Sequence, residues 1–178
     1  MSIRQLSSRV VYHNPWMTVR EDEVERDNGQ RGIYGVVEKH DSAVILPIDG
    51  GHIYLVEQFR YAIGRRSLEL PQGSLERSGL APEEVAREEL EQETGIVAAK
   101  LELLGSFIIA IGYSNQRDYA FLATGLKVGT RRPDREEHDL MLHRLTLSEF
   151  EQKVRDNTID DAQTLAAWAF YRARYPLP

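Results

Sequence analysis

Leu70-Pro71-Gln72-Gly73 through Gly95-Ile96 (LPQGSLERSGLAPEEVAREELEQETGI) predicts a loop that leads into one acidic helix. Pro82 suits the first turn of a helix, where a missing N–H costs nothing, and Glu83 and Glu84 complement the positive end of the helix dipole. Gly95 is typical of the residue that follows a helix. We therefore expect a helix that begins near Pro82 and ends before Gly95.

The inward face of this helix carries charge. On a helical wheel at about 100° per residue, an apolar arc is formed by Val85, Ala86 and Leu90. Glu89 and Glu93 fall inside that arc, and Gln92 lies at its edge. Acidic residues four apart are usually solvated surface, but two carboxylates that face a core need a cation or protons. Arginine would serve, and so would a hard divalent ion with oxygen ligands.

Length and composition restrict the class of protein. With 178 residues, of which 42% are hydrophobic, the chain can bury the core of one domain with or without an N-terminal extension. The absence of cysteine excludes disulfides and thiolate metal sites. No signal sequence or membrane-length apolar run is present, so we expect a cytoplasmic protein without a membrane partner. The net charge of −6 argues against nucleic acid as a partner, because such binding needs a basic face.

Along the chain, apolar runs and turn signals predict a mixture of strands and helices. The first two strands, Met17–Arg26 and Gly32–Glu38, flank the hairpin signal Asp27-Asn28-Gly29 and carry Trp16 and Tyr34. A two-stranded unit is marginal alone and must dock on the main body or on a second chain. Further strands are expected at Ser42–Ile48, His52–Phe59, Lys100–Ile111, Asp118–Thr124 and Leu140–Leu145, and closing helices at Ser148–Asp156 and Asp161–Arg174.

Two charged segments leave alternatives open. Arg60, Arg65 and Arg66 precede the loop that feeds the acidic helix, and they either bind phosphate or offset the acidic helix in salt bridges. Glu136 and Glu137 lie in a charged loop, where ordinary exposed charge is the alternative to a functional role.

The stretch around the acidic helix resembles the Nudix box: Gly, five residues, Glu, seven residues, Arg-Glu, apolar, any, Glu-Glu, any, Gly, apolar. The matching residues are Glu89, Leu90, Glu93, Gly95 and Ile96. The chain departs from the motif at Leu80 and Glu88, which replace its Glu and Arg, and at Gln92, which replaces the first Glu of its pair. Gly73 lies one residue too early, which indicates an insertion in the loop.

Beyond the box, nearly the full chain resembles the ADP-ribose pyrophosphatase branch of the Nudix family. The resemblance is carried by Asn14-Pro15-Trp16, Glu21-Asp22, Asn28-Gly29, Gln58-Phe59-Arg60-Tyr61, Leu68-Glu69-Leu70-Pro71-Gln72-Gly73 and Asp160-Asp161-Ala162-Gln163-Thr164. It implies an α/β fold, an α/β/α sandwich around a mixed sheet with an N-terminal antiparallel β extension. It further implies an extension over 1–40 that forms a homodimer, and a Nudix domain over 41–178.

The same resemblance implies the roles of individual residues. Mg²⁺ or Mn²⁺ would be held by Glu89 and Glu93, with the backbone carbonyl of Gln72 beside them and the amide oxygen of Gln92 as a weaker donor. Glu136 or Glu137 would position or deprotonate the attacking water. Arg60 would contact phosphate and Glu69 would fix the loop, while Trp16 and Tyr34 would sandwich a base across the dimer.

Three functional hypotheses follow. The first is a metal-dependent hydrolase of the pyrophosphate in a nucleoside diphosphate-linked substrate, such as ADP-ribose or another nucleotide sugar. The second is a Nudix-fold module that binds a nucleotide or sugar nucleotide with little turnover, as a sensor does. The third is a plain α/β domain with an acidic surface helix, which would leave the order of motifs a coincidence.

Overall fold

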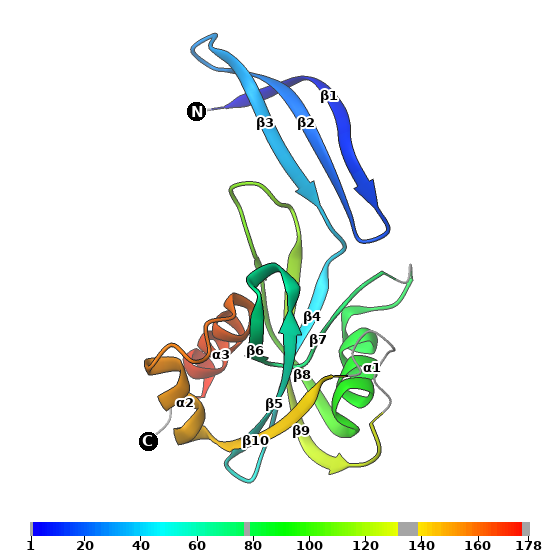
Figure 1. Cartoon of the computed structure of the whole chain (residues 1–178), viewed down its shortest axis with the longest axis vertical. Coiled ribbons are helices and arrows are strands. Elements are labelled where there is room, and N and C mark those ends of the chain that lie inside the picture. The colour runs from blue at the N-terminus through cyan, green and yellow to red at the C-terminus, as the bar shows by residue number, and fades with distance from the viewer. Residues whose placement is uncertain (1, 77–78, 132–138, 176–178) are drawn as a thin grey trace. The chain divides into compact units, whose positions relative to one another are not determined.

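A computed structural model of the chain describes residues 2–76, 79–131 and 139–175 (Figure 1). They divide into two compact units, a first unit of Met1–Asp41 with Ile108–Arg117 and a second unit of Ser42–Phe107 with Asp118–Pro178. None of the helices described is long and apolar enough to cross a membrane. The first unit thus contains Asp41 and the segment 108–117 in addition to residues 1–40, and the division into domains at residues 40 and 41 stays a prediction.

The first unit contains an antiparallel sheet in the order β1-β2-β3, formed by β1 (Ile3–Asn14), β2 (Met17–Arg26) and β3 (Arg31–Glu38). The hairpin between β2 and β3 turns at Gly29, whose φ of 80° favours glycine. The prediction of only two strands was wrong, because β1 adds a third. Bulges between Gln5 and Ser7 and between Val10 and Tyr12 interrupt the alternation by which sequence reasoning identifies a strand.

The segment 108–117 is tied to the free edge of β3. The backbone N–H of Val37 donates to the carbonyl of Tyr113 at 2.7 Å, and Val37 forms a parallel bridge with Ser114. The hydroxyl of Tyr34 donates to the carbonyl of Gly112 at 2.6 Å. Backbone pairing therefore continues the N-terminal sheet beyond β3.

The second unit is built around a mixed sheet in the order β10-β5-β4-β9-β8, with β6 paired to β5 and β7 paired to β4. The pair β4–β9 is parallel. The strands are β4 (Ser42–Asp49), β5 (His52–Arg60), β6 (Arg65–Glu69), β7 (Gln72–Ser74), β8 (Ile96–Ile108), β9 (Arg117–Val128) and β10 (Met141–Thr146), and the helices are α1 (Pro82–Thr94), α2 (Leu147–Arg155) and α3 (Ala162–Arg174).

Strand β4 is buried on both faces, as its near-continuous apolar sequence predicts. Ala43 and Ile45 belong to the core cluster that contains Leu90 of α1. Val44 and Leu46 belong to the cluster that contains residues of α2 and α3. Figure 1 shows α1 on one side of this sheet and the other two helices on the opposite side. The predicted α/β/α sandwich is therefore confirmed.

Helix α1 begins and ends where the sequence predicts. The carboxylate of Glu84 accepts from the backbone N–H of Ala81 at 2.7 Å, and Gly95 follows the helix with a φ of 72°. A Cβ at Gly95 would stand 2.9 Å from the carbonyl oxygen of Gly129 and 2.8 Å from the amide nitrogen of Arg131. Only glycine fits there, because both the backbone conformation and the close approach exclude a side chain.

Candidate active site

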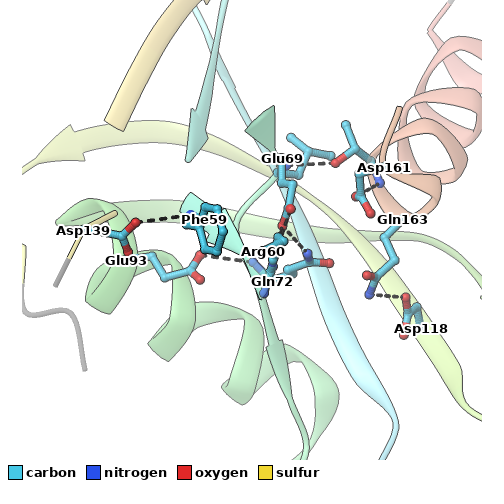
Figure 2. A network of polar contacts seen from close by, with 11 residues as sticks. Phe59, Arg60, Glu69, Gln72, Glu93, Asp118, Asp139, Asp161 and Gln163 are labelled. Atoms are coloured by element: carbon cyan, nitrogen blue, oxygen red, sulfur yellow. Dashed lines mark hydrogen bonds and ion pairs between the residues drawn. The ribbon is translucent and has the colours of Figure 1, made fainter. Parts of the chain in front are cut away.

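Two carboxylates of α1 lie on its inward face, as the helical wheel predicts. Glu93 is only 1% exposed, and its Oε2 accepts a hydrogen bond of 3.1 Å from the backbone N–H of Gln72 (Figure 2). Glu89, one turn earlier, is half-buried. Its side chain lies against Gly73 so closely that a Cβ there would stand 2.1 Å from the Glu89 carboxyl carbon. Gly73 thus leaves the space that the side chain of Glu89 occupies.

Next to these carboxylates, Glu69 holds two side chains in place. It forms an ion pair with Arg60, whose Nε also donates to Glu69 Oε1 at 2.9 Å. It accepts a second bond of 2.9 Å from the side-chain amide of Gln72. The hydrogen bond to Glu69 raises the pKa of Arg60 above its ordinary value, while burial acts in the opposite direction. Arg60 is therefore a fixed cation beside the acidic helix.

The side chain of Gln72 contains an oxygen without a partner. Its Oε1 is buried and makes no hydrogen bond within the part of the chain that the structure describes. A buried polar atom of this kind is costly unless a ligand, ion or water satisfies it. The side-chain oxygen of Gln72, a residue whose backbone contacts Glu93, is therefore open to a ligand, an ion or a water molecule.

The residues present fit a divalent cation. Mg²⁺ is usually bound by one or two carboxylates, several waters and the phosphates of a substrate, rather than by a cage of protein ligands. Glu89 and Glu93 supply such a pair, and among the described residues no cluster of three or more His, Cys, Asp or Glu provides a complete cage. Gln92 is half-buried on the same helix and contributes an uncharged amide oxygen.

A cleft of about 400 Å³ lies between Arg60, Glu69 and Gln72 and the N-terminal end of α3. Its lining contains Arg60, Ala62, Ile63, Arg65, Ser67, Glu69, Gln72, Asp160, Asp161, Ala162 and Gln163. This volume lies within the range of about 300 to 1,000 Å³ that small-molecule sites have. The cleft thus joins the predicted phosphate-binding arginine to the Asp160–Thr164 motif.

The N-terminal end of α3 is fixed to the loop that precedes α1. Asp161 caps the helix by accepting from the backbone N–H of Thr164 at 2.8 Å. The hydroxyl of Thr164 accepts from the backbone N–H of Leu70 at 2.9 Å, and Thr164 is completely buried. The two walls of the cleft are therefore linked through a direct hydrogen bond.

The three arginines all make salt bridges. Arg60 pairs with Glu69 and Arg65 with Asp160. Arg66 pairs with Glu57 at 2.8 Å and Asp139 at 2.9 Å, and these carboxylates raise its pKa. None of these partners lies in the acidic helix α1, so these salt bridges are not the ones that the alternative expected, and Arg60 and Arg65 also line the cleft.

Glu136 and Glu137 lie outside the described residues. The residues on either side of this segment are anchored, because Arg131 donates to the carbonyl of Leu140 at 2.9 Å. Asp139 also accepts from the backbone N–H of Phe59 at 3.2 Å. The assignment of a water-activating role to either glutamate stays a prediction.

In the first unit, Trp16 lies in the turn between β1 and β2 rather than on a strand. Asn14 shapes this turn, since its Oδ1 accepts from the backbone N–H groups of Trp16 at 2.9 Å and Met17 at 2.8 Å. Trp16 is 53% exposed and lines a pocket of about 210 Å³ together with His13 and residues 38–40. Tyr34 instead fixes Gly112 through its hydroxyl.

Sequence reasoning assigned no role to Gln163 or Asp118. Gln163 lines the cleft and donates to the carboxylate of Asp118 at 2.7 Å (Figure 2). The available signal was the Asp160–Thr164 motif at the start of a helix, where the capping aspartate Asp161 orients the first turn.

Comparison with known proteins agrees with this arrangement. A family model described as "Nucleoside diphosphate sugar hydrolase N-terminal domain" matches residues 3–37, and one described as "NUDIX domain" matches residues 38–168. An ADP-ribose pyrophosphatase of Mycobacterium tuberculosis is 31% identical over 163 residues, 90% of this chain and 79% of the relative. An ADP-ribose pyrophosphatase of Bacillus subtilis is 30% identical over 158 residues, 88% of this chain and 85% of the relative.

Among solved structures, the crystal structure of an ADP compounds hydrolase is similar in fold. It has a TM-score of 0.86 and 22% sequence identity, and the match covers 98% of this chain and 94% of that chain. Since the identity is low, this likeness concerns the fold, and it includes almost the whole of both chains.

Proposed function

The chain belongs to the NUDIX family as a pyrophosphohydrolase, and on this premise we propose that it cleaves the pyrophosphate of ADP-ribose or a related nucleotide sugar with Mg²⁺ or Mn²⁺. The observation that carries the proposal is the position of Glu93, buried in α1 and bonded to the backbone of Gln72. The names of the relatives support the substrate class. A binding module without turnover is not favoured, because both of these relatives are named as pyrophosphatases.

We assign the metal site to Glu89, Glu93 and the backbone carbonyl of Gln72. A bound divalent ion would neutralise the diphosphate and lower the pKa of a coordinated water. Arg60, oriented by Glu69, would donate to phosphate oxygens. Glu136 or Glu137 would accept the proton of the attacking water.

The reaction is a displacement at phosphorus. The water oxygen forms a bond to one phosphorus of the diphosphate, and the bond from that phosphorus to the bridging oxygen breaks. The products are a nucleoside monophosphate and a sugar phosphate. The water proton passes to the glutamate, and the positive charge of Arg60 stabilises the negative charge that develops on the phosphate oxygens.

Gln92 distinguishes this site from the family motif. It retains an oxygen donor and removes a full negative charge from the face that carries Glu89 and Glu93. Two unit charges 4 Å apart interact by about 4 kcal/mol at an effective dielectric constant of 20, before desolvation. We propose one firmly held ion and a second position that depends on the oxygens of the substrate diphosphate.

We also propose that the protein is a cytoplasmic homodimer that associates through the N-terminal extension of residues 1–40, with 41–178 as the Nudix domain. Its β1 exposes large apolar side chains, including Val10 at 63% and Tyr12 at 54%. A cluster of exposed apolar residues is typical of an interaction surface. In such a dimer, Trp16 and Tyr34 would contribute to the binding of the base.

A screen of nucleotide sugars tests the proposed function. ADP-ribose, ADP-glucose, UDP-glucose and GDP-mannose would be incubated with the protein and Mg²⁺ or Mn²⁺, and the sugar phosphate detected with phosphatase. We expect release from ADP-ribose or another member of the panel, and none in the presence of a chelator. Absence of release from every member, with both metals, would contradict the proposal.

A further inference from the structure

We propose that Gln163 is a specificity-determining residue, which recognises a hydroxyl group of the sugar attached to the diphosphate. The proposal rests on the proposed function, and it assigns the end of the cleft near α3 to the sugar. Three features support it: the way in which Gln163 is held, the chemistry of the cleft around it, and the rigid connection to the acidic helix.

The orientation of Gln163 is set by a buried carboxylate. Asp118 has 0% exposure, and it accepts from the hydroxyl of Ser42 as well as from Nε2 of Gln163 at 2.7 Å. An ionised carboxylate can only accept hydrogen bonds, so the Gln163 amide must turn its NH₂ group toward Asp118. Its Oε1 is thereby turned the other way. Because Gln163 lines the cleft, this oxygen is an acceptor in a fixed position.

The charges around Gln163 favour a neutral ligand group with hydroxyls over a second phosphate. The lining contains two arginines and three carboxylates, a net charge of −1. At the end near α3, Arg65 is paired with Asp160, and Asp161 adds another carboxylate. Hydroxyl groups can donate to carboxylate and amide oxygens, whereas a phosphate would be repelled by these groups. Sugar hydroxyls therefore match this end of the cleft.

At the opposite end lies Arg60, a cation that suits a diphosphate. Its guanidinium is held in place by Glu69. The hydrogen bond from Leu70 to Thr164 fixes the spacing between this end and the residue next to Gln163. A substrate whose phosphates bind near Arg60 would thus place its sugar within the same cleft, toward α3.

A site that hydrogen-bonds a ligand hydroxyl discriminates against ligands without it, because its own polar group is then left unpaired. Replacing Gln163 should consequently lower affinity for the sugar-containing ligand alone. Gln163→Met keeps a similar volume and removes both polar atoms. Gln152→Met makes the same chemical change at an exposed position of α2 and is the matched control.

Calorimetric binding in the presence of a chelator, which prevents metal-dependent turnover, separates the two ends of the cleft. The probes are ADP-ribose, ADP-glucose and the β-methyl ester of ADP, which has the same diphosphate charge and no sugar hydroxyls on that side. We expect Gln163→Met to weaken binding of at least one of the two sugar ligands about tenfold. Binding of the methyl ester to Gln163→Met should change less than twofold. Gln152→Met should leave the binding of all three ligands unchanged.

Equal weakening of all three ligands would overturn the proposal, since it would indicate a role in phosphate binding or in folding. Unchanged binding of both sugar ligands would overturn it as well. Thermal unfolding of each variant identifies a folding defect. Failure of the proposed function has a different result: the wild type would bind the sugar ligands but release no sugar phosphate from them with Mg²⁺ or Mn²⁺. A wild type that binds none of the three probes would overturn the role of Gln163.

Discussion

The backbone N–H of Gln72 donates a hydrogen bond of 3.1 Å to Oε2 of Glu93. This bond connects the loop before α1 to a carboxylate that is almost completely buried in the helix. It also explains why the loop has a defined position over the helix. In an extended strand the N–H and the C=O of one residue point to the same side, so we expect the carbonyl of Gln72 to face the acidic helix as well.

Manganese should bind at this face. Crystals grown or soaked with Mn²⁺ should show an anomalous scattering peak within coordinating distance of the carboxylates of Glu89 and Glu93, because carboxylate oxygens are preferred ligands of such ions. Crystals that contain Mg²⁺ in place of Mn²⁺ are the control, because Mg²⁺ does not give this anomalous signal. A peak elsewhere, with both glutamates bonded only to protein groups, would contradict the assignment.

Gly73→Ala should weaken the metal site and leave the fold intact. The new Cβ would collide with the Glu89 side chain at 2.1 Å, and this side chain can move away because its carboxyl end is flexible. We expect Mn²⁺ affinity, measured by calorimetry, to fall at least about tenfold, or roughly 1.4 kcal/mol. Gly35→Ala is the matched control, since a Cβ there would meet no atom within 4 Å. Equal Mn²⁺ affinities of the two variants would contradict the claim that the space at Gly73 positions Glu89 for the metal.

Gln92→Glu should tighten metal binding and raise activity, most clearly at low metal concentration. The substitution restores a negative charge beside Glu89 and Glu93 without a large change in volume. The measurement is the hydrolysis rate as a function of Mg²⁺ concentration for both proteins. A lower rate in the variant at every concentration would mean that the altered motif serves a chemistry other than the one proposed.

The local elements of the fold follow from the sequence to a large extent. Met17–Arg26 was predicted with the bounds that β2 has, because a hairpin signal defines its end. The helix from Pro82 to Thr94 was predicted from its terminal residues and its apolar arc. These signals depend on neighbouring residues only, so they can be recognised without the rest of the structure.

Elements that depend on distant partners could not be recognised in this way. The short strands β6 and β7 form by pairing with β5 and β4, and no apolar alternation marks them. The contact between Gln163 and Asp118 joins residues 45 positions apart in the chain. For the same reason the orientation of Gln163 and the existence of the cleft became apparent only in the folded structure.

The protein should be a dimer in solution. Light scattering at micromolar concentration should give about twice the chain mass of 20.4 kDa. Val10→Lys should shift the population toward the monomer, because it would place a charge on the apolar surface of β1. Ser7→Lys introduces the same charge on the opposite face of the same strand and is the control for a general effect of charge. A wild type that is monomeric throughout this concentration range would contradict the proposed dimer.

The most direct test of the metal-dependent hydrolase is the effect of Glu93→Gln on AMP release from ADP-ribose with Mg²⁺. The amide keeps an oxygen that can accept from Gln72, so we expect an unchanged thermal midpoint, with kcat/KM reduced at least about 100-fold, or roughly 2.7 kcal/mol. Glu91→Gln, on the exposed face of the same helix, should retain wild-type activity. An active Glu93→Gln variant, or equal losses in the two variants, would contradict the assignment of Glu93 as the buried metal ligand.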